Sequence, residues 1–208
     1  MSHRPDIAKN NPKGSVSNGA RQIVQIGDDV LRGHAKAIRI QDIRGSHIKK
    51  LISDMKALLA KEEYGVAIAA PQVGEALRLF IVSGKAMEKR KRSNRAHHRT
   101  ESDERALNEL PAEDEVYINP ELIKLSRGRQ EKHEGCLSVR GRWGMVPRAQ
   151  KATLRAFNER GEQFTRGASG LLAQIFQHEL DHLDGVLYID KATELHEEES
   201  TDADRKPA

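Results

Sequence analysis

Two stretches of the chain carry apolar residues three and four positions apart, the spacing that lines one face of a helix. In the first stretch these positions are Ile48, Leu51, Ile52, Met55, Leu58 and Leu59. They predict an amphipathic helix over residues 46–62, with Ser46 as its N-cap. The second stretch predicts a helix over residues 169–183. Gly185 would end this helix, because glycine readily adopts the left-handed conformation that follows a helix.

Strands are predicted where β-branched and aromatic residues form short runs between turn residues. These runs cover residues 77–82, 115–118, 122–125, 152–157 and 186–189. Residues 158–161, with the sequence Asn-Glu-Arg-Gly, have the composition of a hairpin turn.

The other segments lack apolar periodicity and are predicted to lie outside the core. Residues 1–20 are rich in Asn, Ser, Gly and Lys, which predicts a flexible leader. Residues 84–115 carry a basic half and then an acidic half, which is typical of a solvated insertion; a basic arm that binds RNA is the alternative. Residues 192–208 are acidic and predict a disordered tail. One catalytic domain over residues 21–191 would contain the insertion.

Length and composition fit one globular domain with appendages. The chain has 208 residues, of which 37% are hydrophobic, and 35 basic residues against 31 acidic ones leave a formal charge of +4. Because this excess is small, charge gives little support to a nucleic-acid partner. No apolar stretch approaches the ~18 residues of a membrane span, and the start of the chain lacks the apolar run of a secretory signal. We therefore expect a cytoplasmic protein.

The second predicted helix carries the residues with the most specific chemistry, His178-Glu179-Leu180-Asp181-His182. Imidazoles at positions i and i+4 stand on one helical face and can bind one metal ion, and the Glu between them can reach a water on that metal. A solvated helix with chance histidines is the alternative. The apolar face of the same helix argues against it, because a buried polar cluster needs a partner.

Two histidines leave a catalytic metal site one protein ligand short, since such sites commonly have three ligands and an open position. Cys136 is the best candidate for the third ligand. It is the only cysteine, so it cannot form an intrachain disulfide, and it follows Gly135, which lets the backbone approach closely. Thiolate and imidazole together suit zinc or ferrous iron. A cysteine taken alone is more often a small buried residue.

Three segments together resemble the peptide deformylase family, and they occur in the family's order. They are Gly-Val-Ala-Ile-Ala-Ala-Pro-Gln at 65–72, Glu-Gly-Cys-Leu-Ser at 134–138 and Gln-His-Glu-Leu-Asp-His-Leu-Asp-Gly at 177–185. The likeness extends over residues 22–190 and includes Val-Pro-Arg-Ala at 146–149. It implies an α+β fold, in which antiparallel β-sheets pack around a central metal-binding helix. It also implies removal of the formyl group from the N-terminal formyl-methionine of newly synthesised polypeptides, with release of formate.

The resemblance implies roles for residues in all three segments. One divalent metal ion, natively Fe2+ with Zn2+, Ni2+ or Co2+ as substitutes, would be held by Cys136, His178 and His182. Glu179 would take the proton of the attacking water and pass it to the departing amine. The amide of Gln72 and the backbone N–H of Leu137 would stabilise the oxyanion.

Helix geometry places a pocket for the methionine side chain beside these residues. The predicted substrate-binding residues are Gly65, Val66, Ala67, Leu171, Gln174 and Ile175. Plain core packing is the alternative for Leu171 and Ile175. Glu134 and Asp181 are predicted to hold the ligands or Arg148 in place, with a surface charge as the alternative for either acid.

Several positions depart from the family pattern. Ala67 replaces a glycine, and its methyl group would narrow the path beside the substrate backbone. Gln174 stands where aliphatic residues are usual, so we expect a weaker preference for methionine. Directly after Ser138 the family often reads Pro-Gly, whereas this chain has Val-Arg-Gly-Arg-Trp at 139–143, which alters the rim of the site. The acidic tail does not match the basic C-terminal helix to which ribosome docking has been attributed in some members. The expected partners are N-formyl-Met nascent peptides, with a transient ribosome contact left open, and neither a membrane nor a specific nucleic-acid sequence.

Two other functions fit part of the pattern. A peptidase of the His-Glu-x-x-His type would share the helix and the role of Glu179, but those enzymes usually take a third His, Glu or Asp instead of a cysteine. A binding protein with a structural zinc and a basic RNA arm would need four ligands. With a single cysteine, it would have to recruit a further histidine.

Overall fold

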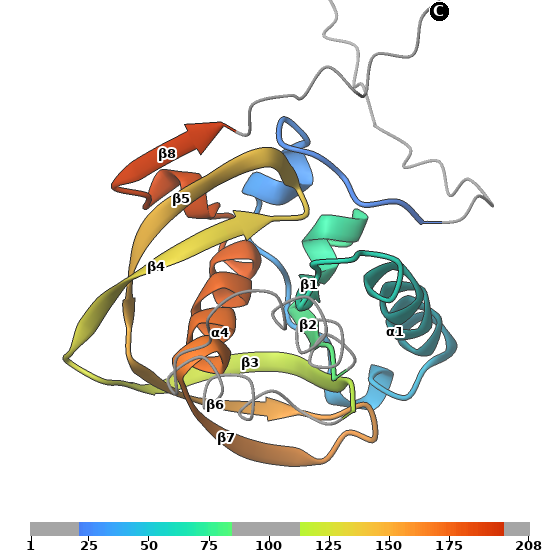
Figure 1. Ribbon diagram of the computed structural model, residues 1–208. Coiled ribbons are helices and arrows are strands. Elements are labelled where there is room, and N and C mark those ends of the chain that lie inside the picture. The colour runs from blue at the N-terminus through green and yellow to red at the C-terminus, as the bar shows by residue number, and fades with distance from the viewer. Residues whose placement is uncertain (1–20, 85–112, 198–208) are drawn as a thin grey trace, which may run out of the picture.

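The computed structural model describes residues 21–84 and 113–197 (Figure 1). The predicted leader, most of the predicted insertion and residues 198–208 of the predicted tail lie outside the described residues. Within the described ranges, none of the helices has the length and apolar character needed to cross a membrane.

Antiparallel sheets and two α-helices make up the described part of the fold (Figure 1). The larger sheet has the strand order β1 (Ala67–Ala69), β2 (Leu79–Val82), β3 (Glu115–Leu125), β6 (Lys151–Phe157) and β7 (Gln163–Ser169). The smaller sheet has the order β4 (Arg129–Cys136), β5 (Val139–Ala149) and β8 (Glu194–Glu197). The α-helices are α1 (Ser46–Leu59) and α4 (Gly170–Leu183), and short 3-10 helices are η1 (Asp29–Arg32), η2 (Ile40–Asp42), η3 (Ala70–Val73) and η5 (Tyr188–Asp190).

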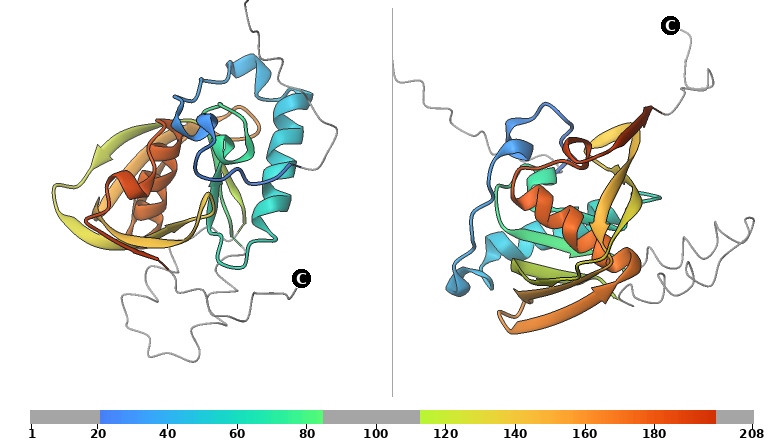
Figure 2. Two further views of the ribbon diagram at one scale, coloured as in Figure 1. Left: turned by 90° about the horizontal axis from the view of Figure 1, so that it is seen from above. Right: turned by 90° about the vertical axis from the view of Figure 1, so that its left-hand side faces the viewer.

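Helix α4 lies between the β4–β5 ribbon and the larger sheet, as both views in Figure 2 show. The ring of Phe176 on α4 lies 5.2 Å from that of Tyr117 and 6.2 Å from that of Phe80, centroid to centroid. Helix α1 packs through Leu51 and Met55 in a second apolar cluster on β1 and β2. The predicted α+β fold around a central helix is therefore confirmed.

Several predicted elements have different bounds in the structure: the helix predicted over 46–62 ends at Leu59, and the strand predicted over 77–82 begins at Leu79. Gly45, not Ser46, is the N-cap of α1; its backbone is extended, and its carbonyl accepts a hydrogen bond from the N–H of Lys49. The predicted strands over 115–118 and 122–125 form the single strand β3. Asn119 has a φ of 50°, and the register with β6 shifts beyond Ile118, so an irregularity separates the two halves without ending the strand.

The strand predicted over residues 186–189 is wrong. Tyr188–Asp190 form the 3-10 helix η5, and the Asp190 carboxylate accepts a hydrogen bond of 2.8 Å from the N–H of Leu187. This local side-chain bond competes with strand pairing. Leu187 and Tyr188 are both buried, so the apolar residues of this segment pack in the core although the segment joins no sheet.

The prediction of a disordered tail from residue 192 is wrong for its first residues. Glu194–Glu197 form β8, which pairs with β5. The ring of His196 stacks on Trp143 at 4.0 Å, and Glu197 pairs with Arg142 at 2.7 Å. Cross-strand contacts of this kind stabilise a strand that acidic composition alone does not predict.

Candidate active site

The three predicted metal ligands lie together. His178 and His182 are one turn apart on α4, with ring centroids 5.0 Å apart, and Cys136 is the last residue of β4. The register between β4 and β5 shifts between Gly135 and Cys136, so the strand is irregular where it reaches the cluster. The Cys136 Sγ lies 3.2 Å from His182 Nε2. Donor atoms of all three residues lie within 4.8 Å of one another.

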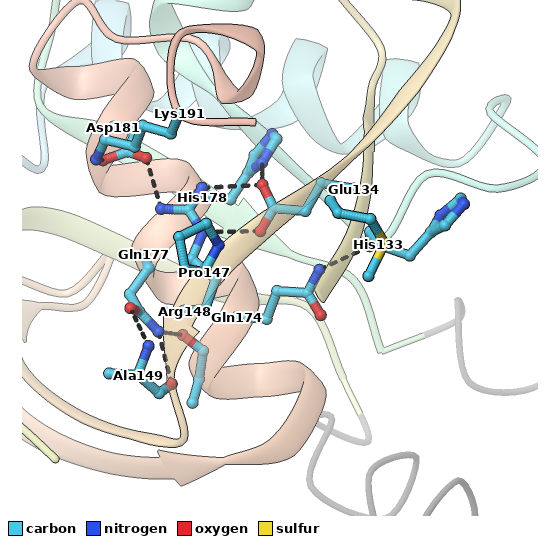
Figure 3. A network of polar contacts seen from close by, with 12 residues as sticks. His133, Glu134, Pro147, Arg148, Ala149, Gln174, Gln177, His178, Asp181 and Lys191 are labelled. Atoms are coloured by element: carbon cyan, nitrogen blue, oxygen red, sulfur yellow. Dashed lines mark hydrogen bonds and ion pairs between the residues drawn. The ribbon is translucent and has the colours of Figure 1, made fainter. Parts of the chain in front are cut away.

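Glu134 orients the ring of His178 (Figure 3). Its Oε2 lies 2.9 Å from His178 Nδ1, so Nδ1–H is the donor and Nε2 is left for the cluster. Glu134 is buried, and burial would raise the pKa of its carboxyl. Hydrogen bonds from Arg148 and His178 outweigh that effect and lower the pKa to about 2. The anionic carboxylate therefore fixes the tautomer of the histidine.

Arg148 closes an ion-pair network behind Glu134 (Figure 3). Its Nε and Nη2 donate to the two oxygens of Glu134 at 2.8 and 2.9 Å, and its Nη1 donates to Asp181 Oδ2 at 2.7 Å. Lys191 Nζ lies 2.6 Å from the other oxygen of Asp181. The predicted grouping of Glu134, Asp181 and Arg148 is thus present, with Lys191 as an additional member.

Glu179 carries a buried carboxylate oxygen without a partner. The residue is 3% exposed, and its Oε2 makes no hydrogen bond within the described part of the chain. Burial raises the pKa of Glu179 to about 7. A buried polar atom left unpaired in this way is a common sign of a bound water or ion.

The donor set fits a divalent metal ion. Burial opposes the charged form of His178, but its hydrogen bonds with Cys136 and Glu134 raise its pKa well above the usual value, whereas burial and the charge of His178 lower the pKa of His182 well below it. Sulfur and imidazole are ligands that zinc and ferrous iron accept. Among the described residues this group has three ligands, which matches a catalytic site with an open position better than a closed structural site.

Gln72 is held in one orientation beside the cluster. It lies in η3 and is 2% exposed, and its Oε1 accepts a hydrogen bond of 2.8 Å from the N–H of Ala69. The amide Nε2 consequently points the other way, at 3.5 Å from the Cys136 Sγ and 3.3 Å from the Ser138 Oγ. An N–H donor is therefore fixed beside the sulfur.

A cavity of about 510 Å³ opens onto these residues. Among its lining residues are the predicted Gly65, Val66, Ala67, Gln72, Glu134, Cys136, Leu137, Leu171, Gln174, Ile175, His178 and Glu179. His182 is buried behind them at 1% exposure, and Asp181 and Arg148 line a different cavity. The structure therefore brings the predicted substrate-binding residues to one cavity with the predicted catalytic ones.

Known proteins are similar to this chain in both sequence and fold. The model of the family described as polypeptide deformylase matches residues 20–198. The chain belongs to this family. The peptide deformylase of Halothermothrix orenii is 38% identical over 177 residues, which cover 85% of this chain and 96% of that protein. Peptide deformylase 2 of Clostridium acetobutylicum is 34% identical over 175 residues, which cover 84% and 96%.

Solved deformylases have the same fold. The Legionella pneumophila structure matches with a TM-score of 0.67 and 32% identity, covering 84% of this chain and 87% of that one. An Acinetobacter baumannii deformylase solved with bound Met-Ala-Ser matches with a TM-score of 0.67 and 27% identity, covering 84% and 99%. The chain is thus a hydrolase of a metal-dependent family, with a cysteine–histidine cluster that could hold the metal.

Sequence reasoning missed two residues that line this deformylase cavity, Tyr64 and His133. Tyr64 is 78% exposed at the rim, and the ring of His133 stacks on Trp143 at 4.1 Å. Each of the two directly precedes a family motif. His133 directly precedes Glu134, the first residue of the motif that contains Cys136, and this adjacency is the signal that could have found it.

Replacing Arg148 with Ala should lower the free energy of unfolding by about 3–5 kcal/mol, because buried Glu134 would lose its cation and half-buried Asp181 would keep only Lys191. Urea unfolding at neutral pH, followed by circular dichroism, measures the change. Arg155→Ala is the matched control. It removes an ion pair with Glu121 whose side chains are 47% and 62% exposed, and should change stability little. Equal losses in the two variants would contradict a stabilising role for the buried network.

Proposed function

We propose that this chain removes the formyl group from the N-terminal formyl-methionine of newly synthesised polypeptides and releases formate. The observation that carries the proposal is the Glu179 carboxylate, whose buried Oε2 has no partner in the described part of the chain, beside the Cys136, His178 and His182 cluster in a member of the polypeptide deformylase family. The Acinetobacter baumannii relative solved with Met-Ala-Ser holds a peptide of the kind that such a reaction would leave.

Cys136, His178 and His182 are the proposed ligands of one divalent ion. Fe2+ is the proposed native metal, and Zn2+, Ni2+ or Co2+ would suit the same donors. Such an ion, when bound, supplies Lewis acidity that makes water more acidic and polarises the formyl carbonyl. The hydrogen bond from His178 Nδ1 to Glu134 supports this assignment, because it leaves Nε2 as the ligand atom.

Glu179 is proposed to move the proton. Its carboxylate accepts a proton from the attacking water as the water oxygen adds to the formyl carbon. It then donates that proton to the amine nitrogen as the C–N bond breaks. A pKa raised by burial to about 7 supports both steps near neutral pH, because the group can accept and release a proton there.

Gln72 and Leu137 are proposed to stabilise the charge on the formyl oxygen. Both residues line the cavity, and the hydrogen bond from Ala69 N–H to Gln72 Oε1 keeps the amide N–H group directed toward the site. The backbone N–H of Leu137 directly follows Cys136. Donors that are fixed before the reaction need not reorganise as negative charge develops, which is the basis of an oxyanion hole.

The proposed substrate is a nascent chain, so the reaction would take place where proteins are synthesised. We propose the cytoplasm as its location, because nascent chains that begin with formyl-methionine are made there. A transient ribosome contact would bring the cavity to these chains. The basic half of the insertion and the last residues of the acidic tail, which bear on that contact, lie outside the described residues.

Mass spectrometry of products tests the proposed reaction. Formyl-Met-Ala-Ser should yield formate and a free amine, the acetylated peptide should react far more slowly, and internal peptide bonds should stay whole. The reason is that a deformylase holds only a small acyl cap beside the metal, whereas a peptidase must hold chain on both sides of the bond. Cleavage of an internal bond in an unformylated peptide at a comparable rate would establish the peptidase alternative.

Gln174 is proposed to weaken the selection of methionine. Its Nε2 donates to the His133 carbonyl at 2.9 Å, so a polar side chain forms part of the pocket wall. We expect formyl-Met peptides to be preferred over formyl-Ala peptides by only about tenfold in kcat/KM, and Gln174→Leu to raise that ratio several-fold through added apolar contact. Gln163→Leu, at an exposed position of β7 outside the cavity, is the control. An unchanged ratio in Gln174→Leu would remove this residue from substrate selection.

A further inference from the structure

A second cavity, of about 840 Å³, lies on another face of α4. It is lined by Gln177, Leu180 and Asp181 of this helix and by its C-cap Asp184, whereas the catalytic cavity is lined by Leu171, Gln174, Ile175, His178 and Glu179. Residues three and four apart share a helical face, so α4 presents one face to each cavity. The volume falls in the range of small-molecule sites, about 300–1,000 Å³.

One ion pair separates the two cavities. Arg148 lines the second cavity and Glu134 lines the catalytic one, and they bond directly at 2.8 and 2.9 Å. Figure 3 shows this pair beside His178, with Asp181 and Lys191 on the opposite side of Arg148 from Glu134; Asp181 and Lys191 both line the second cavity. A molecule bound there would contact the groups that hold a proposed metal ligand in place.

Part of the wall of the second cavity is apolar. The apolar lining residues are Ala37, Pro120, Leu122, Leu125, Pro147 and Leu180. Leu122 is 43% exposed even though it lies on a cavity wall. Apolar surface that remains in water within a concave site is a feature of ligand-binding cavities.

Among the described residues, all but one of the charged side chains that line this cavity have an ion-pair partner. Arg78 pairs with Asp184 at 2.7 Å, and Glu121 pairs with Arg155 at 2.6 Å. Asp181, Lys191 and Arg148 belong to the network that also contains Glu134. Arg129 is the charged lining residue without an ion-pair partner in the described part of the chain. Its Nη1 donates to the carbonyl of Pro147, another lining residue, at 3.3 Å. The cavity therefore offers an apolar wall and one uncompensated positive charge.

We propose that this second cavity binds a small amphiphilic monoanion. Its apolar chain or ring lies against Leu122 and Leu125, and its carboxylate pairs with Arg129. A single negative charge matches the guanidinium of Arg129, the lining cation without an ion-pair partner among the described residues. A dianion would place its second charge near Asp181 or Asp184, whose own cations are already paired.

Octanoate titrated into the metal-loaded full chain, followed by isothermal calorimetry, tests the proposal. Arg129→Ala should weaken octanoate binding by about tenfold or more, since a charge-assisted hydrogen bond is lost. The matched control is Arg127→Ala, which removes an exposed arginine two residues before Arg129, in the turn between β3 and β4; Arg127 does not line the cavity. It should leave the affinity unchanged. Leu122→Asp should abolish binding, and neutral octanamide should bind the native chain as weakly as octanoate binds Arg129→Ala.

Three results would overturn the proposal. Equal affinity of the native chain and Arg129→Ala would place octanoate elsewhere, for example at the catalytic metal. Equal losses in Arg127→Ala and Arg129→Ala would indicate a general effect of surface charge. The third is the lack of saturable binding up to about 10 mM, which would leave no site of useful affinity.

Discussion

Replacing Glu179 with Gln should lower the turnover of a formyl-Met peptide by ~100-fold or more while the bound metal remains. Gln has nearly the same shape, so α4 and the three proposed ligands are kept. An amide cannot accept the proton of water and pass it to the amine. Steady-state kinetics and metal analysis on the same preparation measure the two quantities separately, and loss of both together would point to a structural effect of the substitution.

The pH profile adds a second readout for Glu179. Burial raises the pKa of this carboxyl to about 7, and the positive charge of a bound ion would act in the opposite direction. A general base works in its deprotonated form, so the native rate should fall as the pH drops through this pKa. The acid limb should be missing in Glu179→Gln and retained in Glu159→Gln, which changes an exposed acid. Near-full activity of Glu179→Gln would remove Glu179 from the mechanism.

The metal cluster was predictable because its strongest signals are local. His178 and His182 share a helical face through their spacing alone, and the chain has only one cysteine to offer as a third ligand. The long apolar stripes of α1 and α4 likewise predict their helices, although capping by Gly45 shows that a terminus depends on backbone geometry that composition does not reveal.

The polar strands and the outer ion pairs were not predictable in the same way. β4 has the sequence Arg-Gln-Glu-Lys-His-Glu-Gly-Cys and buries Glu134 alone, so no apolar alternation marks it as a strand. β4 is a strand because its backbone pairs with β5, a contact that the sequence of β4 alone does not indicate. Lys191 reaches Asp181 only because η5 replaces the predicted strand, and β8 depends on its contacts with Trp143 and Arg142. Each case rests on tertiary contacts that outweigh local preference.

Replacing Cys136 with Ala should remove most of the bound metal and the activity with it. The variant would keep His178 and His182 but lose the only sulfur donor, and two imidazoles seldom hold a catalytic ion alone. Cys136→Ser is the matched variant: it keeps the size of the side chain and replaces sulfur by a hard oxygen. It should also bind the metal weakly, because soft thiolate contributes much of the affinity for zinc and ferrous iron.

Thermal unfolding with and without added metal separates loss of a ligand from loss of the fold in Cys136→Ala. A ligand that binds only the folded state stabilises it by an amount that grows with its concentration relative to Kd, about 4 kcal/mol at a thousandfold excess. Added Zn2+ or Fe2+ should therefore raise the midpoint temperature of unfolding of the native chain and leave that of Cys136→Ala nearly unchanged. Without metal, the two chains should unfold at similar temperatures, because Cys136 is a partly buried residue at the edge of an apolar cluster. One tightly bound metal ion per chain in Cys136→Ala, with normal turnover, would show that the third ligand is another residue.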